Sequence, residues 1–383
     1  MALSFEITPK IICEQGSAGN LHEVIVQLGG SRAMFVTDRG MLGTGLLDPV
    51  VNECKSAGVE VSVYADVQAD PPEAMVLEAV RFASENAVDI VVGIGGGSSM
   101  DTAKLVALLA KTPQPLPQIY GIGLAKGPRL PLIQVPTTAG TGSEATPISI
   151  VTTPSHEKKG VVSPLLYPDV AVLDGLLTLG LPPSVTAMTA IDAMVHAIEA
   201  YTSRHKKNVL SDMFAVKALD LLYRNIRSAV FDGKNADARE KMLLGSLLAG
   251  IAFANSPVAA VHALAYPLGG HFGLPHGLTN SLMLVPVLRF NRDAAVTYYA
   301  QLGRHLLELP ADASDENAAD AFIQAIAQLV EEMPYAQNLR EAGVGDDDLT
   351  MLATDAMKVQ RLLVNNPRDV SYEDALSLYR EAL

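Results

Sequence analysis

Short apolar runs alternate with amphipathic segments along the first half of the chain. We expect four of these runs to be strands, at residues 33–37, 59–64, 90–93 and 132–135. Residues 46–57 and 73–85 have the apolar spacing of helices and would connect successive strands. Strands that alternate with helices are typical of βαβ units, so this half predicts a Rossmann-like α/β domain with a largely parallel sheet.

The pattern changes after Leu181, Pro182 and Pro183. From Ser184 onward, apolar positions recur at helical spacing in segment after segment, and no convincing strand is visible. A chain of 383 residues is long enough for two domains that each have a full core. We therefore expect an α/β domain over residues 1–181 and an all-helical domain over residues 182–383.

The amino-acid composition indicates which kinds of molecule the protein is expected to bind. Hydrophobic residues make up 49% and charged residues 18%, as in a globular chain. A net charge of −14 argues against a nucleic-acid surface or an anionic membrane, so small molecules are the expected partners. Cys13 and Cys54 show no CxxC spacing, which fits a reducing compartment. Residues 1–10 contain no basic region followed by an apolar core, so we expect a cytoplasmic location.

One long stretch of the second half contains no Asp, Glu, Lys or Arg. It runs over residues 242–288 and at first resembles a membrane span. Prolines, paired glycines and three histidines interrupt it, so no continuous apolar run of about twenty residues exists. We expect this stretch to form the buried centre of the helical domain.

Four residues that lie in chain segments with few charged neighbours have the spacing of metal ligands. Asp192 and His196 lie four residues apart, which places them on one face of a predicted helix. His262 and His276 follow, and we expect the prolines and glycines between them to break the helix and turn the chain back. One carboxylate and three imidazoles suit Zn(II) or Fe(II), although an Asp-to-His hydrogen bond would also satisfy the first pair.

A glycine-rich turn at residues 95–97 separates a predicted strand from a predicted helix. Such a turn lets backbone N–H groups approach a phosphate, and the positive end of the helix favours the negative charge. The structural alternative is a plain strand-to-helix turn in which Ser98 caps the helix and Asp101 closes a capping box.

Two further features would lie near this turn. Residues 136–144 follow another predicted strand and are rich in small hydroxyl side chains, so they would line the same site. Asp38 ends the strand at residues 33–37. It would accept hydrogen bonds from an adenosine ribose and repel a 2′-phosphate, or it would be an ordinary turn residue before Arg39 and Gly40.

Four motifs, in this order, resemble the iron-containing (group III) alcohol dehydrogenases. They are GGGSSMDTAK at residues 95–104, PTTAGTGSE at 136–144, DAMVH at 192–196 and PHG at 275–277. The resemblance covers nearly the whole chain. It implies a dinucleotide-binding α/β domain followed by an all-helical metal-binding domain, the fold shared with dehydroquinate synthase.

The resemblance also implies roles for individual residues. The metal would be held by Asp192, His196, His262 and His276, and the pyrophosphate of NAD by Gly95, Gly96, Gly97, Ser98 and Ser99. Asp38 would select the ribose of NAD. The second cofactor loop would use Thr137, Thr138, Thr141 and Ser143, with Lys158 reaching the cofactor and Phe253 lining the substrate pocket.

One position departs from many members of this family. They carry a further histidine four residues after the third ligand, whereas this chain has Tyr266. In those members the histidine has been linked to proton transfer. The proton relay would then fall to the Tyr266 hydroxyl, to His271 or to a chain of water molecules.

The resemblance implies an NAD-dependent, metal-dependent alcohol dehydrogenase or aldehyde reductase. Hydride would pass between nicotinamide C4 and a small primary alcohol or diol, with Fe(II) or alternatively Zn(II) polarising the substrate oxygen. Alternatives are a maleylacetate reductase, a hydroxyacid-oxoacid transhydrogenase, a dehydroquinate-synthase-like lyase or a non-catalytic NAD- and metal-binding regulator. The family commonly assembles, so we expect a homodimer or larger homo-oligomer.

Overall fold

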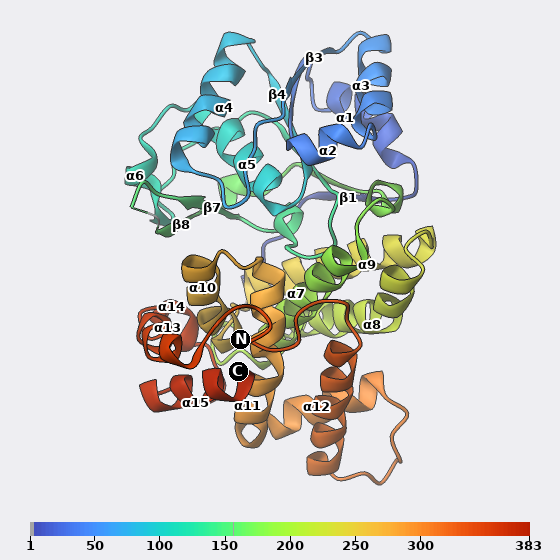
Figure 1. The fold of residues 1–383 in the computed structure, drawn as a ribbon. Coiled ribbons are helices and arrows are strands. Elements are labelled where there is room, and N and C mark those ends of the chain that lie inside the picture. The colour runs from blue at the N-terminus through green and yellow to red at the C-terminus, as the bar shows by residue number, and fades with distance from the viewer. Residues whose placement is uncertain (1–3, 156) are drawn as a thin grey trace. The chain divides into compact units, whose positions relative to one another are not determined.

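The structure is a computed structural model that describes residues 4–155 and 157–383. The chain divides into two compact units (Figure 1). The first, here the sheet unit, contains Glu6–Leu181 and Lys234–Leu247. The second, here the helical unit, contains Pro182–Gly233 and Leu248–Leu383, together with Ser4 and Phe5. The chain thus passes from one unit to the other after Leu181, but a later segment returns to the sheet unit.

A parallel sheet forms the centre of the sheet unit, as predicted, and it has six strands. Its order is β1 (Lys10–Cys13), β9 (Val170–Leu173), β6 (Leu132–Pro136), β4 (Ile90–Gly95), β2 (Arg32–Val36) and β3 (Glu60–Tyr64). The four strands expected from the sequence are present, whereas β1 and β9 were not expected. The sheet therefore extends further than the sequence pattern indicated, through β9 to β1.

Helices contribute to apolar cores on both faces of this sheet. They are α1 (Leu21–Gln27), α2 (Arg39–Gly43), α3 (Leu47–Ser56), α4 (Glu73–Glu85), α5 (Gly97–Lys111) and α6 (Leu116–Ile119). Met34 and Val36 of β2 join a core with α4 and α5, while Ala33 and Phe35 join another with α1 and α3. This alternation follows from the period of two in a strand. It explains why β2 reads as a continuous apolar run, since both faces are covered.

A second, three-stranded sheet completes the sheet unit and was not predicted. It contains β5 (Gly121–Ile122), β8 (Lys158–Val162) and β7 (Ile148–Thr152), in that order. β7 and β8 pair antiparallel. Lys158 and Lys159 begin β8 and are exposed, so this strand lacks the apolar run by which the central strands were identified.

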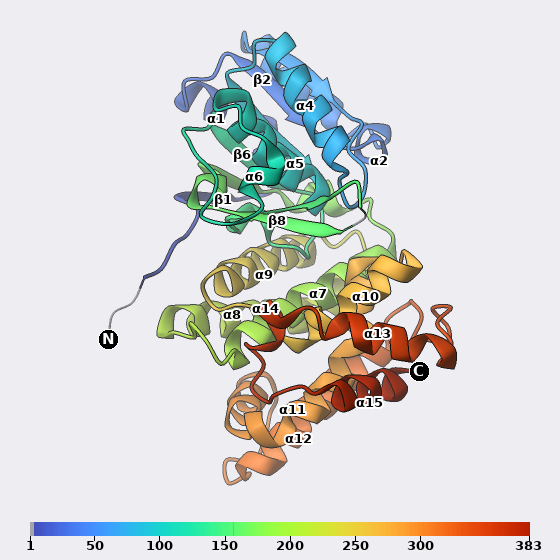
Figure 2. The ribbon, with the colours of Figure 1, turned by 90° about the vertical axis from the view of Figure 1, so that its left-hand side faces the viewer.

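The helical unit contains no strand among the described residues, as predicted. Its helices are α7 (Pro183–Thr202), α8 (Val209–Phe231), α10 (Ala260–Phe272), α11 (His276–Leu306), α12 (Asp315–Glu331), α13 (Leu349–Ala356), α14 (Gln360–Leu363) and α15 (Tyr372–Ala382). A further helix, α9 (Ala236–Asn255), has residues in both units. α11 packs against α7, α10, α12 and α15 (Figure 2).

The expected break between His262 and His276 is shorter than predicted. α10 continues through Pro267, Gly269 and Gly270 to Phe272. Pro267 is buried, so packing of the helix overrides the local cost of a proline. The chain turns only at residues 273–275, where Gly273 has a φ of 63°. His276 consequently begins α11 and does not lie on a returning loop.

None of the described helices is, by itself, long and apolar enough to cross a membrane. α9 and α10 meet that threshold only as a pair, and they are bent by 106° relative to each other.

Candidate metal centre and dinucleotide site

Three histidine side chains of the helical unit converge on one carboxylate oxygen, that of Asp192. Asp192 and His196 come from one face of α7, His262 from the first turn of α10 and His276 from the start of α11. The Oδ1 atom of Asp192 lies 3.9 Å from Nε2 of His196, 3.9 Å from Nε2 of His262 and 3.7 Å from Nε2 of His276. The structure thus brings together all four residues that the sequence predicted as ligands.

Asp192, His196 and His262 each offer one ligand atom, and these three atoms lie within 4.8 Å of one another, as the ligands of one metal ion do. Nε2 of His276 lies 3.7 Å from Oδ1 of Asp192, beyond the distance of a direct hydrogen bond. Asp192, His196 and His262 are buried, and the His276 side chain is 38% exposed. One oxygen and three imidazole nitrogens fit Fe(II) or Zn(II), and His276 marks the accessible side of the cluster.

The histidines also set the ionisation of the buried aspartate. Burial by itself raises the pKa of Asp192, but His196, His276 and His262 lower it, as does a hydrogen bond from Asn280. The net effect is a pKa below the ordinary value. Asp192 is therefore ionised at neutral pH and supplies the negative charge that a divalent cation requires.

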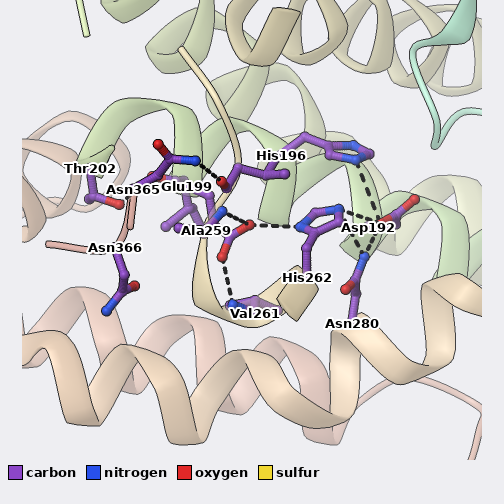
Figure 3. Close-up of polar contacts among 12 residues, drawn as sticks. Asp192, His196, Glu199, Thr202, Ala259, Val261, His262, Asn280, Asn365 and Asn366 are labelled. Carbon is purple, nitrogen blue, oxygen red and sulfur yellow. Dashed lines mark hydrogen bonds and ion pairs between the residues drawn. The ribbon is translucent and has the colours of Figure 1, made fainter. Parts of the chain in front are cut away.

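Glu199 orients one of the histidines (Figure 3). Its Oε2 atom lies 2.7 Å from Nδ1 of His262, and its carboxylate also accepts hydrogen bonds from the backbone N–H groups of Ala259 (3.0 Å) and Val261 (2.7 Å). A carboxylate can only accept, so Nδ1 carries the proton and Nε2 presents its lone pair toward Asp192. Sequence reasoning missed Glu199, although it lies three residues after His196 on the same helix face.

Asn280 is a second neighbour that sequence reasoning missed. Its Nδ2 atom lies 2.5 Å from Oδ1 of Asp192 and 3.2 Å from Nε2 of both His262 and His276. It follows His276 by four residues on α11, a spacing that placed it on the same face. Asn280 therefore contacts three of the four candidate ligands through one amide nitrogen.

Two aromatic rings border the cluster. The ring of Phe253 stacks on His196 with centroids 4.4 Å apart, and the ring of Tyr266 lies 6.0 Å from that of His276. Burial raises the pKa of Tyr266, while Arg361 opposes this by its charge and a hydrogen bond. Both predicted residues are thus beside the candidate ligands.

His271 is placed differently. Its Nε2 atom lies 2.6 Å from the Asp355 carboxylate, which also pairs with Lys358. No contact of His271 with the four candidate ligands is found in the part of the chain that the structure describes. This geometry favours Tyr266 over His271 as the residue next to the chemistry.

The glycine turn in the sheet unit links β4 to α5. Gly96 is the N-cap residue of α5, and no side chain caps the helix. The alternative with Ser98 as N-cap and Asp101 in a capping box is therefore wrong. α5 already begins at Gly97, and Asp101 instead accepts hydrogen bonds from the Ser143 hydroxyl (2.6 Å) and the Ile150 N–H (2.9 Å). The first turn of α5 keeps its N–H groups free of side-chain caps.

Close packing explains two of the glycines. A Cβ atom on Gly97 would lie 2.8 Å from Cγ2 of Thr141, and one on Gly95 would lie 2.6 Å from Oγ of Ser99. Gly95 also has a φ of 150°. The backbone thus approaches its neighbours more closely than a larger residue would allow.

A cavity of about 790 Å³ opens beside this turn. Gly96, Gly97, Ser98 and Ser99 line it, as does Asp38. Asp38 is the N-cap residue of α2, where Oδ1 accepts from the Met41 N–H at 2.9 Å, and its Oδ2 lies 3.5 Å from the Ser99 hydroxyl. Asp38 is therefore both a capping residue and part of the cavity wall.

The segment with the threonines packs against the glycine turn. The Thr137 N–H donates to the Gly95 carbonyl at 2.9 Å, and Thr138 and Thr141 are the side chains nearest to Gly96 and Gly97. Lys158 lies on β8 and pairs with Asp70 at 2.7 Å. The two predicted cofactor loops are thus adjacent, and the lysine already has an acidic partner.

Ser143 belongs to a buried polar cluster that the sequence did not reveal. Its hydroxyl accepts from Nζ of Lys104 at 2.8 Å and donates to Asp101. Lys104 is fully buried and also donates to Thr146 Oγ1 and the Ile148 carbonyl. Burial lowers the pKa of Lys104 to about 8, although the charges of Asp101 and Glu144 oppose this shift. Lys104 therefore ties α5 to the end of the threonine segment.

Comparison with known proteins identifies the family. Residues 8–175 match the iron-containing alcohol dehydrogenases, and residues 186–383 match the C-terminal part of the Fe-containing alcohol dehydrogenase family. The chain belongs to this family, and it is an oxidoreductase.

Relatives cover almost the whole chain. The long-chain-alcohol dehydrogenase 1 of Geobacillus thermodenitrificans is 36% identical over 96% of this chain and 93% of its own length. A solved 1,3-propanediol oxidoreductase is 33% identical, with a TM-score of 0.96 over 100% of both chains. The sulfoacetaldehyde reductase of Bifidobacterium kashiwanohense, solved in complex with NAD⁺, is 28% identical, with a TM-score of 0.89 over 100% of this chain and 99% of that one.

Proposed function

We propose that the protein is an NAD-dependent, metal-dependent alcohol dehydrogenase or aldehyde reductase that acts on small primary alcohols and their aldehydes. The observation that carries this proposal is the convergence of three imidazole Nε2 atoms on Oδ1 of Asp192, at 3.7–3.9 Å. Polarisation of the substrate oxygen is the chemistry that a metal bound there supplies.

Neighbouring residues fix the orientation of two proposed ligands and shield a third from water. Glu199 keeps the Nε2 lone pair of His262 directed at Asp192, and Asn280 fixes the position of the Asp192 carboxylate. Phe253 stacks on His196 and shields it from water. His276 is the most accessible of the four ligands, so we place the reacting end of the substrate on its side.

The proposed dinucleotide site lies at the glycine turn of the sheet unit. The uncapped N–H groups at the start of α5 suit the pyrophosphate, and Thr138 and Thr141 pack against the turn. Asp38 is placed in the cavity wall, where its charge would disfavour a 2′-phosphate. Hydride transfer is the chemistry that the nicotinamide supplies. The NAD⁺ complex of the Bifidobacterium reductase supports this choice of cofactor.

We assign the final proton relay to Tyr266. Its ring lies beside His276, and its pKa is raised by burial, so the hydroxyl keeps its proton near neutral pH. We infer from this position that the hydroxyl passes a proton between the substrate oxygen and solvent. His271, held by Asp355, has no such position.

The test is NADH formation from ethanol, 1-propanol, 1,2-propanediol and glycerol, with protein stripped of metal and then resupplied with Fe(II) or Zn(II). We expect NADH from at least one alcohol, and only after metal is added. Equal activity with and without metal would contradict the metal-dependent reaction. Turnover that consumes no net NAD⁺ would favour a lyase.

A further inference from the structure

A fully buried lysine, Lys104 of α5, faces three hydrogen-bond acceptors. Its Nζ atom lies 2.8 Å from Oγ of Ser143, 3.1 Å from Oγ1 of Thr146 and 2.7 Å from the carbonyl oxygen of Ile148. The Ser143 hydroxyl donates its own proton to Asp101, the Thr146 hydroxyl donates to the Ser143 carbonyl, and a carbonyl can only accept. All three contacts therefore require a proton from Lys104, which the charged ammonium supplies.

Asp101 lies one turn before Lys104 on α5 and binds the same segment. Its carboxylate accepts hydrogen bonds from the Ser143 hydroxyl (2.6 Å) and the Ile150 N–H (2.9 Å), and its backbone carbonyl accepts from the Ser149 hydroxyl (2.9 Å). Nζ of Lys104 is 3.8 Å from Oδ1 of Asp101. The Ser143 hydroxyl thus accepts from the cation and donates to the anion of one helix, which fixes its position relative to α5.

The threonine segment, residues 136–144, is consequently anchored at both ends. Near its start, the Thr137 N–H donates to the Gly95 carbonyl at 2.9 Å. Near its end, Ser143 is bonded to the two charges of α5. The first anchor is a backbone hydrogen bond, whereas the second depends on buried ionised side chains.

The second anchor also determines where the middle of the segment lies. The Ser143 N–H donates to Oγ1 of Thr141 at 3.3 Å, and Thr141 is the side chain nearest to Gly97. Gly97 begins α5, and Lys104 follows it by two turns on the same helix. A shift of Ser143 would therefore move Thr141 relative to the glycine turn.

We propose that Lys104 is a positioning residue for the dinucleotide, and that its ammonium holds the threonine segment against the glycine turn in the arrangement that binds the pyrophosphate. This inference rests on the proposed function. Because Lys104 is fully buried, it acts through Ser143 and Thr141 and not by contact with the cofactor. Burial of charged groups costs free energy, and apolar side chains often replace buried ion pairs without loss of stability, so position explains this group better than stability does.

The test is the affinity of metal-loaded protein for NAD⁺, measured by calorimetry. Lys104→Met keeps much of the side chain's length but removes its charge and its donors. We expect Kd for NAD⁺ to rise about tenfold or more, because the misplaced segment no longer fits the pyrophosphate. In turnover, KM for NAD⁺ should rise with Kd, while kcat at saturating NAD⁺ changes less than about threefold.

A double substitution tests whether Lys104 acts through Ser143. Ser143→Ala keeps both charges but removes the hydroxyl that connects them to the segment, so it should also weaken NAD⁺ binding. Because both changes break one anchor, the loss in the double variant should be no larger than the greater single loss. Losses that multiply would show that the two residues act independently and would overturn the inference.

Arg129 is the matched control, a largely buried cation of the same unit. It donates to the carbonyls of Leu165 and Tyr167 and pairs with Asp169. It lies before β6, whereas the threonine segment follows that strand. Arg129→Met should lower the thermal midpoint and leave Kd for NAD⁺ within about twofold of the wild type, since its partners are remote from the threonine segment.

Each other outcome has a distinct meaning. Wild-type affinity for NAD⁺ in Lys104→Met would overturn this inference but not the proposed reaction. An equal loss of affinity in Arg129→Met would also overturn it, because general destabilisation would then be the cause. If Lys104→Met did not fold, wild-type affinity in Ser143→Ala would overturn it. Wild-type protein that binds no NAD⁺ would overturn the proposed dinucleotide site together with this inference.

Discussion

The Oε2 atom of Glu199 lies 2.7 Å from Nδ1 of His262, and this contact decides which ring nitrogen faces Asp192. The same carboxylate accepts the backbone N–H groups of Ala259 and Val261, at the start of a helix whose own N-cap has no side-chain hydrogen bond. One side chain of α7 thus supplies the missing cap of α10 and selects the tautomer of its histidine. Glu199 therefore both caps α10 and determines which ring nitrogen of the proposed ligand His262 carries the proton.

We expect Glu199→Gln to weaken metal binding about 10- to 100-fold, because an amide cannot accept from all three donors and carries no charge to make His262 more basic. Competition with a chromogenic chelator measures the affinity. Thr202→Val, one turn further along α7, removes only a hydroxyl bonded to the Ile198 carbonyl and should leave the affinity unchanged.

A purely structural role of Glu199 would give a different result. In that case the thermal midpoints of the metal-free and metal-loaded variant would fall by the same amount, and the affinity for the metal would stay that of the wild type. The tautomer itself is accessible to NMR of protein labelled with ¹⁵N-histidine, with His262→Ala used to assign the signal.

Replacing Asp38 should change the choice of cofactor. Asp38→Ser keeps a side-chain oxygen that can cap α2 through Met41 but removes the charge from the cavity wall. We expect kcat/KM with NADP⁺ to rise at least ~10-fold relative to NAD⁺, because a carboxylate next to the ribose repels the 2′-phosphate. Glu78→Gln, which removes a charge from the same cavity, is the control and should alter the ratio much less. If the ratio of kcat/KM with NADP⁺ to that with NAD⁺ were unchanged in Asp38→Ser, the ribose would not bind next to Asp38.

The contact between Gly97 and Thr141 can be tested by a double substitution. The added methyl of Gly97→Ala would lie 2.8 Å from Cγ2 of Thr141, so the threonine segment must shift. We expect NAD⁺ affinity to fall about tenfold, with recovery of at least part of the loss in Gly97→Ala combined with Thr141→Ser, which lacks that carbon. Thr141→Ser alone is the control. If the double variant recovered no NAD⁺ affinity, the contact between the added methyl and Thr141 would not be the cause of the loss.

Glu144 makes stability depend on pH. Burial raises the pKa of Glu144 from 4.5 to about 7, although a backbone hydrogen bond and the charge of Lys104 oppose this shift. Between these values the folded state binds more protons than the unfolded state, so stability is present below pH 4.5 and is lost as the pH rises to 7.

The loss is on the order of 3 kcal/mol for a shift from 4.5 to about 7. Glu144→Gln resembles the protonated acid, so its urea midpoint should match that of the wild type at pH 4.5 and exceed it at pH 8. A wild-type midpoint at pH 8 equal to or above that of the variant would show that Glu144 is stabilised as a carboxylate.

The sequence predicted four of the six strands of the central sheet and the four candidate ligands for physical reasons that are local. The strand β2 is buried on both faces and therefore reads as an apolar run, and Asp192 and His196 stand out on an apolar helix. β1 was missed because its residues, Lys10 to Cys13, are exposed or only half-buried and show no such run.

Other features of the structure depend on contacts between residues far apart in the sequence, which no local sequence pattern indicates. Lysine is rarely buried, so nothing in the sequence marked Lys104 as the centre of a polar cluster. Glu199 meets His262 only because α7 and α10 pack together. Pro267 was read as a helix breaker, but the buried packing of α10 outweighs its local preference.

The most direct test of the account is the metal content of purified protein, measured by mass spectrometry after reconstitution with Fe(II) or Zn(II). We predict one ion per chain in the wild type, almost none in His262→Ala, and an unchanged content in His271→Ala, whose ring is held by Asp355 and lies outside the ligand set. A full complement of metal in His262→Ala would contradict the assignment of the four ligands and, with it, the proposed reaction.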